Sequence, residues 1–450
     1  MKRPSWIRGG PKIIKPIPGP RARRLLARDE RVMSPSLTRA EPVVAEEGWG
    51  CYIRDVDGNV ILDLTSGMFV MNYGYSHPRL IAAAERQLRR LTHFAGTDFY
   101  YEAQVELAER LVGITPGKFG KRVFLSNSGT EAVEAAFKCV RWHTRRPRMI
   151  AFEGGFHGRT MGSLSLTSNV KYSEYFAPLV PGVSFMPFPN PYRPPLGWKP
   201  SEVSHMCIEY IRRAVKERIP ANEVAAVITE PIQGTSGYVI PPPDFYPMLR
   251  ELCDENGWIF IADEIQTGLG RSGKMFAMEH WGVVPDIICL AKGLGGGIAP
   301  IGATIAKESI MDWKPGAHAS TFGGNLLACA AAIEGLRILK EERLVERVAR
   351  LGARALRRLK EIEEESKIVG EARGMGFLMA IEFVKDKGTK EPAVDEREMV
   401  IQEALKRGLL LFRGGKSSIR VAPNFNIPER DLELGLDILD ESIRAVERKC

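Results

Sequence analysis

Cysteine and histidine are scarce in this chain of 450 residues, which contains seven of each. The cysteines lie far apart and form no C-x-x-C pair, so the sequence indicates neither a zinc site nor a disulfide framework. This pattern favours a reducing, cytoplasmic setting. The sequence also contains no H-E-x-x-H and no G-x-S-x-G motif, which leaves zincins and α/β-hydrolases without support.

Long apolar runs are absent as well. No stretch approaches the ~20 apolar residues that a membrane span requires, and the basic, Pro-rich opening lacks the apolar region of a secretory signal. Five arginines between Arg21 and Arg31 would suit a transit peptide. Asp29 and Glu30 interrupt them, and the Pro18-Gly19-Pro20 turn before them favours an ordinary surface helix.

The net charge of +8 raises the question of a nucleic-acid partner. However, the 63 basic residues are spread among 55 acidic ones, with no basic stripe that alternates with aromatic residues. This distribution is typical of a solvated surface. We therefore expect neither a nucleic-acid nor a membrane partner.

The length exceeds the roughly 250–300 residues at which one core stops growing, so more than one domain is expected. Short apolar runs without polar alternation are typical of parallel strands covered on both faces. Helical patterns at 131–144 and 245–256 separate them, which predicts an α/β fold with a mostly parallel sheet. The expected strands are Arg122–Asn127, Met149–Glu153, Val224–Glu230, Trp258–Asp263 and Asp286–Lys292.

The pattern changes after about residue 335. A charged amphipathic stretch at 341–365 precedes strands expected at 376–383 and 409–412, with helices at 397–407 and from Glu429. Near the other end, 51–64 is expected to be a hairpin that turns at Asp57-Gly58-Asn59. We expect a large domain at 76–335 and a small α+β domain at 336–450, which the segment 1–75 joins.

Two of the predicted strands end in residues that can do chemistry. The apolar run 258–261 leads to Asp263, and the run 287–291 leads to Lys292. Ligands of open α/β sheets bind beyond the carboxyl ends of the strands. Either residue alone is also explained by a structural ion pair.

A third segment makes this pair informative. Residues 126–131, SNSGTE, join a predicted strand to a helix, where backbone N–H groups and hydroxyls can hold a phosphate. By itself this segment is equally well explained as a helix N-cap. A phosphate site, a carboxylate and a lysine together match the needs of pyridoxal phosphate (PLP), which forms a Schiff base with lysine and keeps its ring nitrogen protonated beside a carboxylate.

Two rival glycine motifs are rejected. Residues 268–273, GLGRSG, match G-x-G-x-x-G but open no helix long enough for a dinucleotide-binding βαβ unit. The glycines that follow Lys292 are not closed by Gly-Lys-Ser/Thr, so they form no phosphate-binding loop of the ATPase type.

With these motifs in place, the sequence resembles the class III (ornithine and 4-aminobutyrate type) aminotransferases of PLP fold type I. The resemblance extends from about Tyr52 to the final helix. Its motifs, in chain order, are SNSGTEA (126–132), GGFHGRT (154–160), EPIQG (230–234), ADEIQTGLGRSG (262–273), AKGLGGG (291–297) and STFGGN (320–325).

The resemblance implies how the ring of the cofactor is held. Lys292 would carry the cofactor, and Asp263 would pair with the ring nitrogen. Gln266 would hold the phenolic oxygen. Phe156 and Ile265 would lie against the two ring faces. From the residues alone, Phe156 is also explained as a core residue and Gln266 as a strand-end cap.

The resemblance also implies a phosphate site shared between two subunits. Ser128, Gly129 and Thr130 would hold the phosphate of their own subunit, whereas Thr321 would reach the phosphate of a partner, which implies a homodimer. His157 lies beside the ring-stacking residue, and the motif gives it a supporting rather than a catalytic role.

Three further residues bear on the substrate. Arg420 matches the family arginine that clamps an α-carboxylate, although Pro423-Asn424 departs from the double proline of many relatives. Glu230 matches the glutamate that can neutralise this arginine, and Arg159 could meet a distal carboxylate. These residues favour transfer of an amino group from an ω-amino acid, such as 4-aminobutyrate or ornithine, to a 2-oxo acid such as 2-oxoglutarate.

Two alternatives remain open at this stage. Amino-acid racemases share this scaffold, and such an enzyme needs a second acid on the face opposite Lys292. The sequence does not identify that acid, although the segment 68–73 is a candidate for lining the pocket. A non-enzymatic PLP-fold binding protein is disfavoured because every matched catalytic position is intact.

Overall fold

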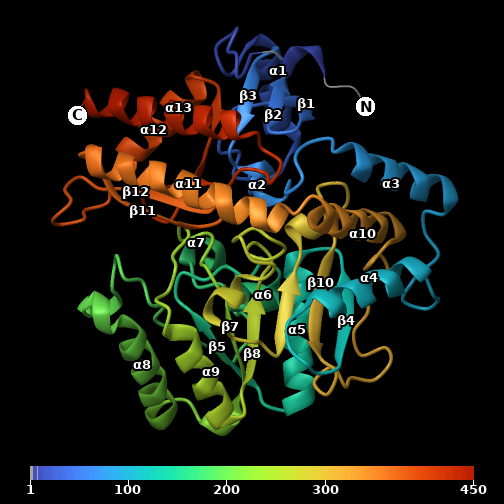
Figure 1. Cartoon of the computed structure of the whole chain (residues 1–450). Helices are drawn as coiled ribbons and strands as arrows, with labels where there is room; N and C mark the ends of the chain where they lie inside the picture. The colour runs from blue at the N-terminus through green and yellow to red at the C-terminus, as the bar shows by residue number, and fades with distance from the viewer. Residues whose placement is uncertain (1–3, 8, 450) are drawn as a thin grey trace.

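The computed structural model describes residues 4–7 and 9–449 of the chain. Its largest element is a seven-stranded sheet, seen in the lower half of Figure 1. In spatial order the strands are β4 (Lys121–Ser126), β10 (Gly302–Lys307), β9 (Ile287–Leu290), β8 (Ile259–Asp263), β7 (Val224–Thr229), β5 (Arg148–Phe152) and β6 (Val183–Met186). The five strands from β9 to β6 are parallel, which confirms the expected α/β fold. The antiparallel strand β10, between β4 and β9, was not predicted.

Each central strand packs one apolar face against one hydrophobic core and its other face against a second core. In β5, Met149 and Ala151 pack with helix α5 (Gly129–Thr144), while Ile150 and Phe152 point to the other side. There they meet α8 (Val203–Glu217) and α9 (Phe245–Asn256). Burial on both faces explains why these strands are apolar without alternation, since each Å² removed from water contributes about 25 cal/mol.

Two four-stranded sheets lie outside the seven-stranded one. One has the order β1 (Ala45–Trp49), β2 (Tyr52–Asp55), β3 (Val60–Asp63) and β13 (Leu409–Leu410); the other has the order β11 (Val369–Met375), β12 (Leu378–Phe383), β15 (Ser418–Val421) and β14 (Phe412–Gly414). The expected hairpin is confirmed, with β2 antiparallel to β3. The single strand expected at 409–412 is wrong: Leu409 pairs with β3, whereas Phe412 pairs with β15 in the other sheet.

The remaining helices cover these sheets. They are α1 (Pro20–Val32), α2 (Ser66–Phe69), α3 (Pro78–Arg90), α4 (Glu102–Ile114), α6 (Met161–Ser165), α7 (Val170–Ser173), α10 (Leu326–Glu341), α11 (Leu344–Glu365), α12 (Val394–Lys406) and α13 (Glu429–Glu447). Short 3-10 helices occur at Ser5–Ile7, Pro195–Gly197, Pro200–Glu202, Ala221–Glu223, Ala277–Trp281 and Lys292–Gly295. Within the described residues, each helix is too short or too polar to cross a membrane.

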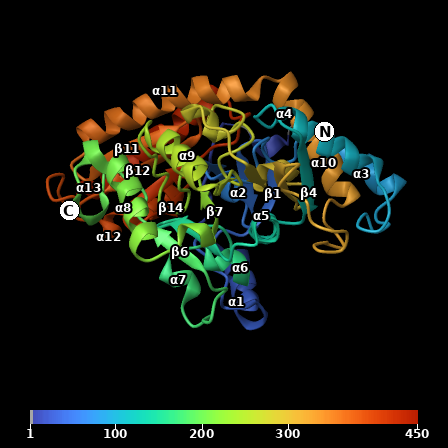
Figure 2. The ribbon, with the colours of Figure 1, turned by 90° about the horizontal axis from the view of Figure 1, so that it is seen from below.

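The N-terminal and C-terminal segments of the chain belong to the same part of the molecule. Helices α1 and α13 are both in the upper part of Figure 1, and β3 pairs in parallel with β13. Turned by 90°, Figure 2 shows α11 and α1 on opposite sides of the molecule. We propose on this basis that 1–75 and 336–450 form the small domain and 76–335 the large one.

Candidate active site

A cavity of about 550 Å³ lies beyond the ends of the parallel strands β8 and β9. Ten of the twelve site residues expected from the sequence line it: Ser128, Gly129, Thr130, Phe156, Arg159, Glu230, Asp263, Ile265, Gln266 and Lys292. Arg420 and Thr321 are not among the described residues in its lining. Val70, His157, Thr235 and the loop 297–301 also line the cavity, and of these the sequence had drawn attention to His157, Gly297 and the segment around Val70.

One wall is the N-terminus of α5. Ser128 is its N-cap, and the side-chain oxygen of Ser128 accepts a hydrogen bond from Glu131 N at 3.3 Å. The hydroxyl of Thr130 forms a hydrogen bond with Thr160 Oγ1 at 2.8 Å. The first N–H groups of a helix have no partner within it. The backbone of Gly129 and Thr130 is therefore suited to hold an anion, with ~0.3–1 kcal/mol from the helix dipole.

The opposite end of the cavity contains a buried carboxylate. Asp263 ends β8, and its Oδ2 lies 2.7 Å from Nδ1 of His157. Its Oδ1 accepts a hydrogen bond from Ile265 N at 3.1 Å. Both side chains are almost fully buried, at 4% exposure for Asp263 and 1% for His157. The pair is therefore shielded from solvent, which strengthens any electrostatic interaction that Asp263 makes in the cavity.

Lys292 follows β9 and is also buried. Burial lowers the pKa of its ammonium group to about 8, while the charges of Asp263 and Glu230 oppose this effect. In the part of the chain that the structure describes, no carboxylate lies within 4 Å of the Lys292 ammonium. The backbone of Lys292 is left-handed, with φ at 41°. Such strain in a non-glycine residue costs about 1–3 kcal/mol and is concentrated at functional sites.

The cavity fits PLP by its unmet polar groups and its shape. The buried Oε1 of Gln266 has no hydrogen-bond partner among the described residues. The phenolic oxygen of PLP, when protonated, would donate a hydrogen bond to it. Gly234 makes room for this amide, because a Cβ there would lie 2.5 Å from Gln266 Oε1. Likewise, a Cβ on Gly129 would lie 2.9 Å from the side chain of Ile265. Together with the buried Lys292, these features suit a flat ring that carries a phosphate.

The structure does not bring Glu230 and Arg420 into direct contact. Both oxygens of Glu230 accept backbone hydrogen bonds at 2.9 Å, from Phe156 N and Gly234 N. Arg420 Nη1 donates to the carbonyl oxygen of the same Gly234, at 3.2 Å. The backbone of Gly234 thus lies between the two charges, with its N–H toward Glu230 and its carbonyl oxygen toward Arg420. Burial raises the pKa of the Glu230 carboxyl and lowers that of the Arg420 guanidinium.

Arg420 is held by aromatic rings and carbonyl groups. Its guanidinium carbon lies 4.5 Å from the ring centre of Phe69, 5.2 Å from that of Phe412 and 5.8 Å from that of Tyr238. Its Nε donates to the carbonyl oxygen of Arg413 at 2.8 Å. Cation–π contacts of this kind are worth more when desolvated, at about 2 kcal/mol. The backbone of Phe69 is itself left-handed, with φ at 69°.

Arg159 and Thr321 are both exposed to solvent. The Arg159 guanidinium stacks 4.4 Å from the ring centre of Tyr172, and the Tyr172 ring contacts the edge of Phe156. Thr321 lies in the loop before α10, where its neighbour Ser320 accepts a hydrogen bond from Asn127 Nδ2 at 3.0 Å. The loop therefore adjoins the cavity, and the contact of Thr321 with a partner subunit stays a prediction.

The α/β fold, the buried lysine and the helix N-terminus at one cavity define the class of this protein: a PLP-dependent enzyme. A sequence model of the class-III aminotransferases matches residues 34–443. The chain therefore belongs to the class III aminotransferase family, as its motifs had indicated.

Several known proteins are similar to this chain. It is 42% identical to an acetylornithine aminotransferase of Methanopyrus kandleri, over 90% of this chain and 95% of that protein. It is 36% identical to an alanine/serine racemase of Pyrococcus horikoshii, over 98% and 95%. A solved PLP-bound amine transaminase from an uncultivated Pseudomonas species superposes with a TM-score of 0.86, at 33% identity over 92% of this chain and 98% of that one.

Proposed function

We propose that this enzyme transfers the amino group of an ω-amino acid, of the 4-aminobutyrate or ornithine type, to a 2-oxo acid such as 2-oxoglutarate. The observation that carries the proposal is that two guanidinium groups lie at separate positions, one in the lining of the cavity and one next to its wall. Arg159 lines it, and Arg420 is joined to its wall through the Gly234 peptide. An ω-amino acid has its carboxylate far from the reacting amine, whereas a 2-oxo acid has one beside the carbonyl, so two separate carboxylate contacts are needed.

In this proposal the residues of the cavity divide the work. PLP, when bound, supplies an electron sink for the bonds of the substrate carbon. Lys292 holds the cofactor and moves a proton at its Nζ, and the Asp263 carboxylate keeps the ring nitrogen protonated. The residues that hold and orient the cofactor are Ser128, Gly129, Thr130, Phe156, Ile265 and Gln266, with Thr321 at the phosphate of the second subunit of a homodimer.

The substrate residues act by charge. Arg420 binds the carboxylate beside the reacting carbon through its fork of N–H groups. Arg159 meets the distal carboxylate of the ω-amino acid. Glu230, whose Oε2 accepts from the N–H of Gly234 while Arg420 donates to the carbonyl oxygen of the same residue, neutralises Arg420 while the distal amine reacts. The relative named for acetylornithine supports this substrate class.

The first test is a half-reaction. We would add 4-aminobutyrate or ornithine to the purified holoenzyme without an acceptor and follow the visible absorbance of the bound cofactor. Conversion to the aminated form, reversed by 2-oxoglutarate, is the expected result. An unchanged band with both amines would contradict the proposal.

Racemisation of an α-amino acid is the second candidate, because the alanine/serine racemase aligns with 98% of this chain. Such an enzyme needs an acid besides Lys292, and Glu230 is a buried carboxyl in the cavity with a raised pKa. Val70, from the segment 68–73, lines the cavity with an apolar side chain. Chiral chromatography of L-alanine or L-serine incubated without acceptor decides between the two: D-amino acid without keto acid would establish the racemase.

A further inference from the structure

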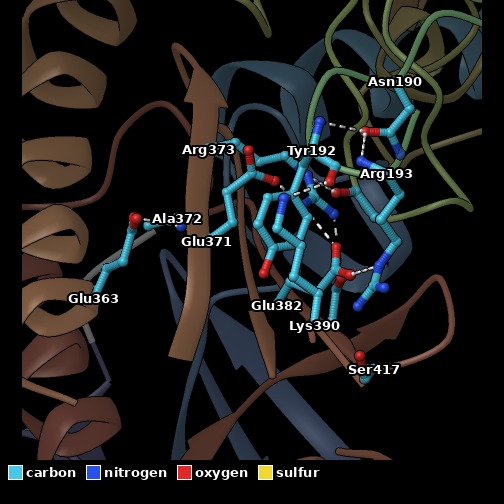
Figure 3. Close-up of polar contacts among 12 residues, drawn as sticks. Asn190, Tyr192, Arg193, Glu363, Glu371, Ala372, Arg373, Glu382, Lys390 and Ser417 are labelled. Carbon is cyan, nitrogen blue, oxygen red and sulfur yellow. Dashed lines mark hydrogen bonds and ion pairs between the residues drawn. The ribbon is translucent and has the colours of Figure 1, made fainter. Parts of the chain in front are cut away.

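A cluster of charged side chains lies where the loop 187–199 meets strands β11 and β12 (Figure 3). Glu382 of β12 forms ion pairs with Arg373 of β11, at 2.7 Å, and with Arg193 of the loop. The side chains of Arg373 and Glu382 are only 9% and 7% exposed. Such a buried pair is weak evidence for stability, because desolvation offsets most of its attraction. The contacts of Arg373 therefore suggest a role other than stabilising the fold.

The guanidinium of Arg373 joins three segments of the chain. Its Nη1 pairs with Glu382, its Nε donates to the carbonyl oxygen of Gly237 at 2.9 Å, and its Nη2 donates to Ser418 Oγ at 3.2 Å. Gly237 belongs to the loop 234–238, and Ser418 begins β15. Since the guanidinium is planar and rigid, these bonds fix the loop against the strand.

Arg420 depends on the same loop and the same strand. It lies on β15, two residues after Ser418, and its Nη1 donates to the Gly234 carbonyl oxygen in the loop. The approach is close, because a Cβ on Gly237 would lie 2.9 Å from Ser418 Oγ. A shift of the loop along β15 would therefore move the carbonyl partner of Arg420.

We propose that Arg373 is a positioning residue that fixes the guanidinium of Arg420 for the carboxylate beside the carbonyl of a 2-oxo acid. Arg373 does not line the described wall of the cavity and acts through Gly237 and Ser418. Glu382, which also pairs with Arg193, and Glu371 hold Arg373 by ion pairs in the cluster that Figure 3 shows. The inference rests on the proposed function, which gives Arg420 that carboxylate.

The test compares two acceptors that differ by one group. Succinate semialdehyde is 2-oxoglutarate without the carboxylate beside the carbonyl. With the aminated holoenzyme, we expect Arg373→Met to raise the half-saturating concentration of 2-oxoglutarate about 10- to 100-fold, as displaced positioning groups do. The value for succinate semialdehyde should stay within about twofold of wild type, because Arg420 has no group to bind there.

Arg250→Met is the matched control. Arg250 pairs with buried Asp286 at 2.8 Å, and Asp286 keeps Lys307 as a second partner, just as Glu382 keeps Arg193. We expect this variant to leave both acceptors unchanged. Arg373→Lys, which keeps the charge beside Glu382 but cannot make all three contacts, should give an intermediate loss for 2-oxoglutarate and serves if Arg373→Met does not fold.

Arg420→Met separates the two proposals. If it loses 2-oxoglutarate selectively and the Arg373 variants do not, the positioning role alone is overturned. An equal effect of the Arg373 variants on both acceptors would also overturn it, because that result indicates general loosening. If Arg420→Met has no selective effect, the proposed role of Arg420 fails, and the positioning role fails with it.

Discussion

Nδ1 of His157 lies 2.7 Å from Oδ2 of Asp263, with both side chains buried at the end of strand β8. Nε2 of the same histidine has no hydrogen-bond partner among the described residues. The imidazole therefore orients the Asp263 carboxylate through its contact with Oδ2. This contact links a motif residue that the sequence marked only as a support to the aspartate expected beside the cofactor.

The first prediction concerns this pair. His157→Phe should lower kcat about 10- to 150-fold, because the loss of one hydrogen bond to a charged group costs about 1.5–3 kcal/mol. Asp263→Asn should lower it much further, since the ring nitrogen then loses its charged partner. Steady-state kinetics measure both, and His280→Phe, outside the lining of the cavity, should keep the wild-type rate. A wild-type rate in Asp263→Asn would refute the role given to that carboxylate.

The second prediction concerns Lys292. Lys292→Ala should lower turnover by about 10⁴-fold or more, the upper range for loss of a general acid–base group. Circular dichroism should show a folded protein, because alanine removes a buried cation that has no carboxylate within 4 Å among the described residues. The visible band that depends on covalent attachment should disappear. A variant that keeps the wild-type rate would exclude Lys292 as the attachment point.

The third prediction is a pH dependence. Because burial lowers the pKa of Lys292 to about 8, its amine is protonated below that pH and cannot attack the aldehyde of PLP. The rate at which apoenzyme captures PLP should rise about tenfold per pH unit up to about 8 and then level off. Stopped-flow absorbance between pH 6 and 10 measures this. A rate that still climbs at pH 10 would indicate an ordinary lysine.

The fourth prediction concerns a buried carboxyl next to the site. Glu264 accepts hydrogen bonds from Met278 N, at 2.9 Å, and from Thr267, and burial raises its pKa to about 7. The folded state thus binds more protons than the unfolded state between pH 4.5 and 7. Its stabilising contribution is complete below pH 4.5 and is lost as the pH rises through 7.

Glu264→Gln should therefore weaken the fall in stability between pH 5 and 8. The change amounts to at most about 3 kcal/mol on the relation between pKa and free energy. Urea unfolding of both proteins at the two pH values measures it. The same fall in the variant as in wild type would show that Glu264 does not titrate in this range.

The fifth prediction concerns the packing of α11. Gly352 rests on the backbone of Gly376, and a Cβ there would lie 2.3 Å from the Gly376 carbonyl oxygen. Gly352→Ala should cost about 1–3 kcal/mol of unfolding free energy, as overpacking against a fixed neighbour does. Gly113→Ala in α4 is the control, because its Cβ would have no described atom within 4 Å and should stabilise by about 0.5–1 kcal/mol. Equal effects of the two substitutions would contradict this account.

Much of the fold could be predicted from the sequence because burial on both faces leaves a simple mark. The parallel strands β5, β7, β8 and β9 are apolar except at their ends, and α9 follows its pattern at both ends. The parallel edge strand β6 was not predicted, because it is short, contains Ser184 and is only partly buried. Strand β10 was missed because GATIAK begins with glycine and ends with lysine, and its pairing with β4 joins residues far apart in the chain. The change of sheet at Leu411 was missed because an apolar run does not say which partner each residue takes.

The site divides in the same way. Asp263 and Lys292 could be predicted together because neighbouring parallel strands end at one edge. The Gly234 peptide between Glu230 and Arg420 could not, since loop conformation decides it. The aromatic rings around Arg420 come from three separate segments, and Phe69 reaches it through left-handed backbone that the sequence does not announce.

The parallel pairing of β3 with β13 has a consequence for how the protein is made. Leu62 pairs with Leu409, so β3 is synthesised early and its partner β13 is synthesised late. The seven-stranded sheet is complete in the growing polypeptide at Lys307, well before β13 emerges. Until then Leu62 has no backbone partner on this edge of β3, although its neighbour Val60 is bridged to Lys12, and an unpaired strand edge is a template for aggregation. Premature termination anywhere before Leu409 therefore leaves that edge open in the truncated product.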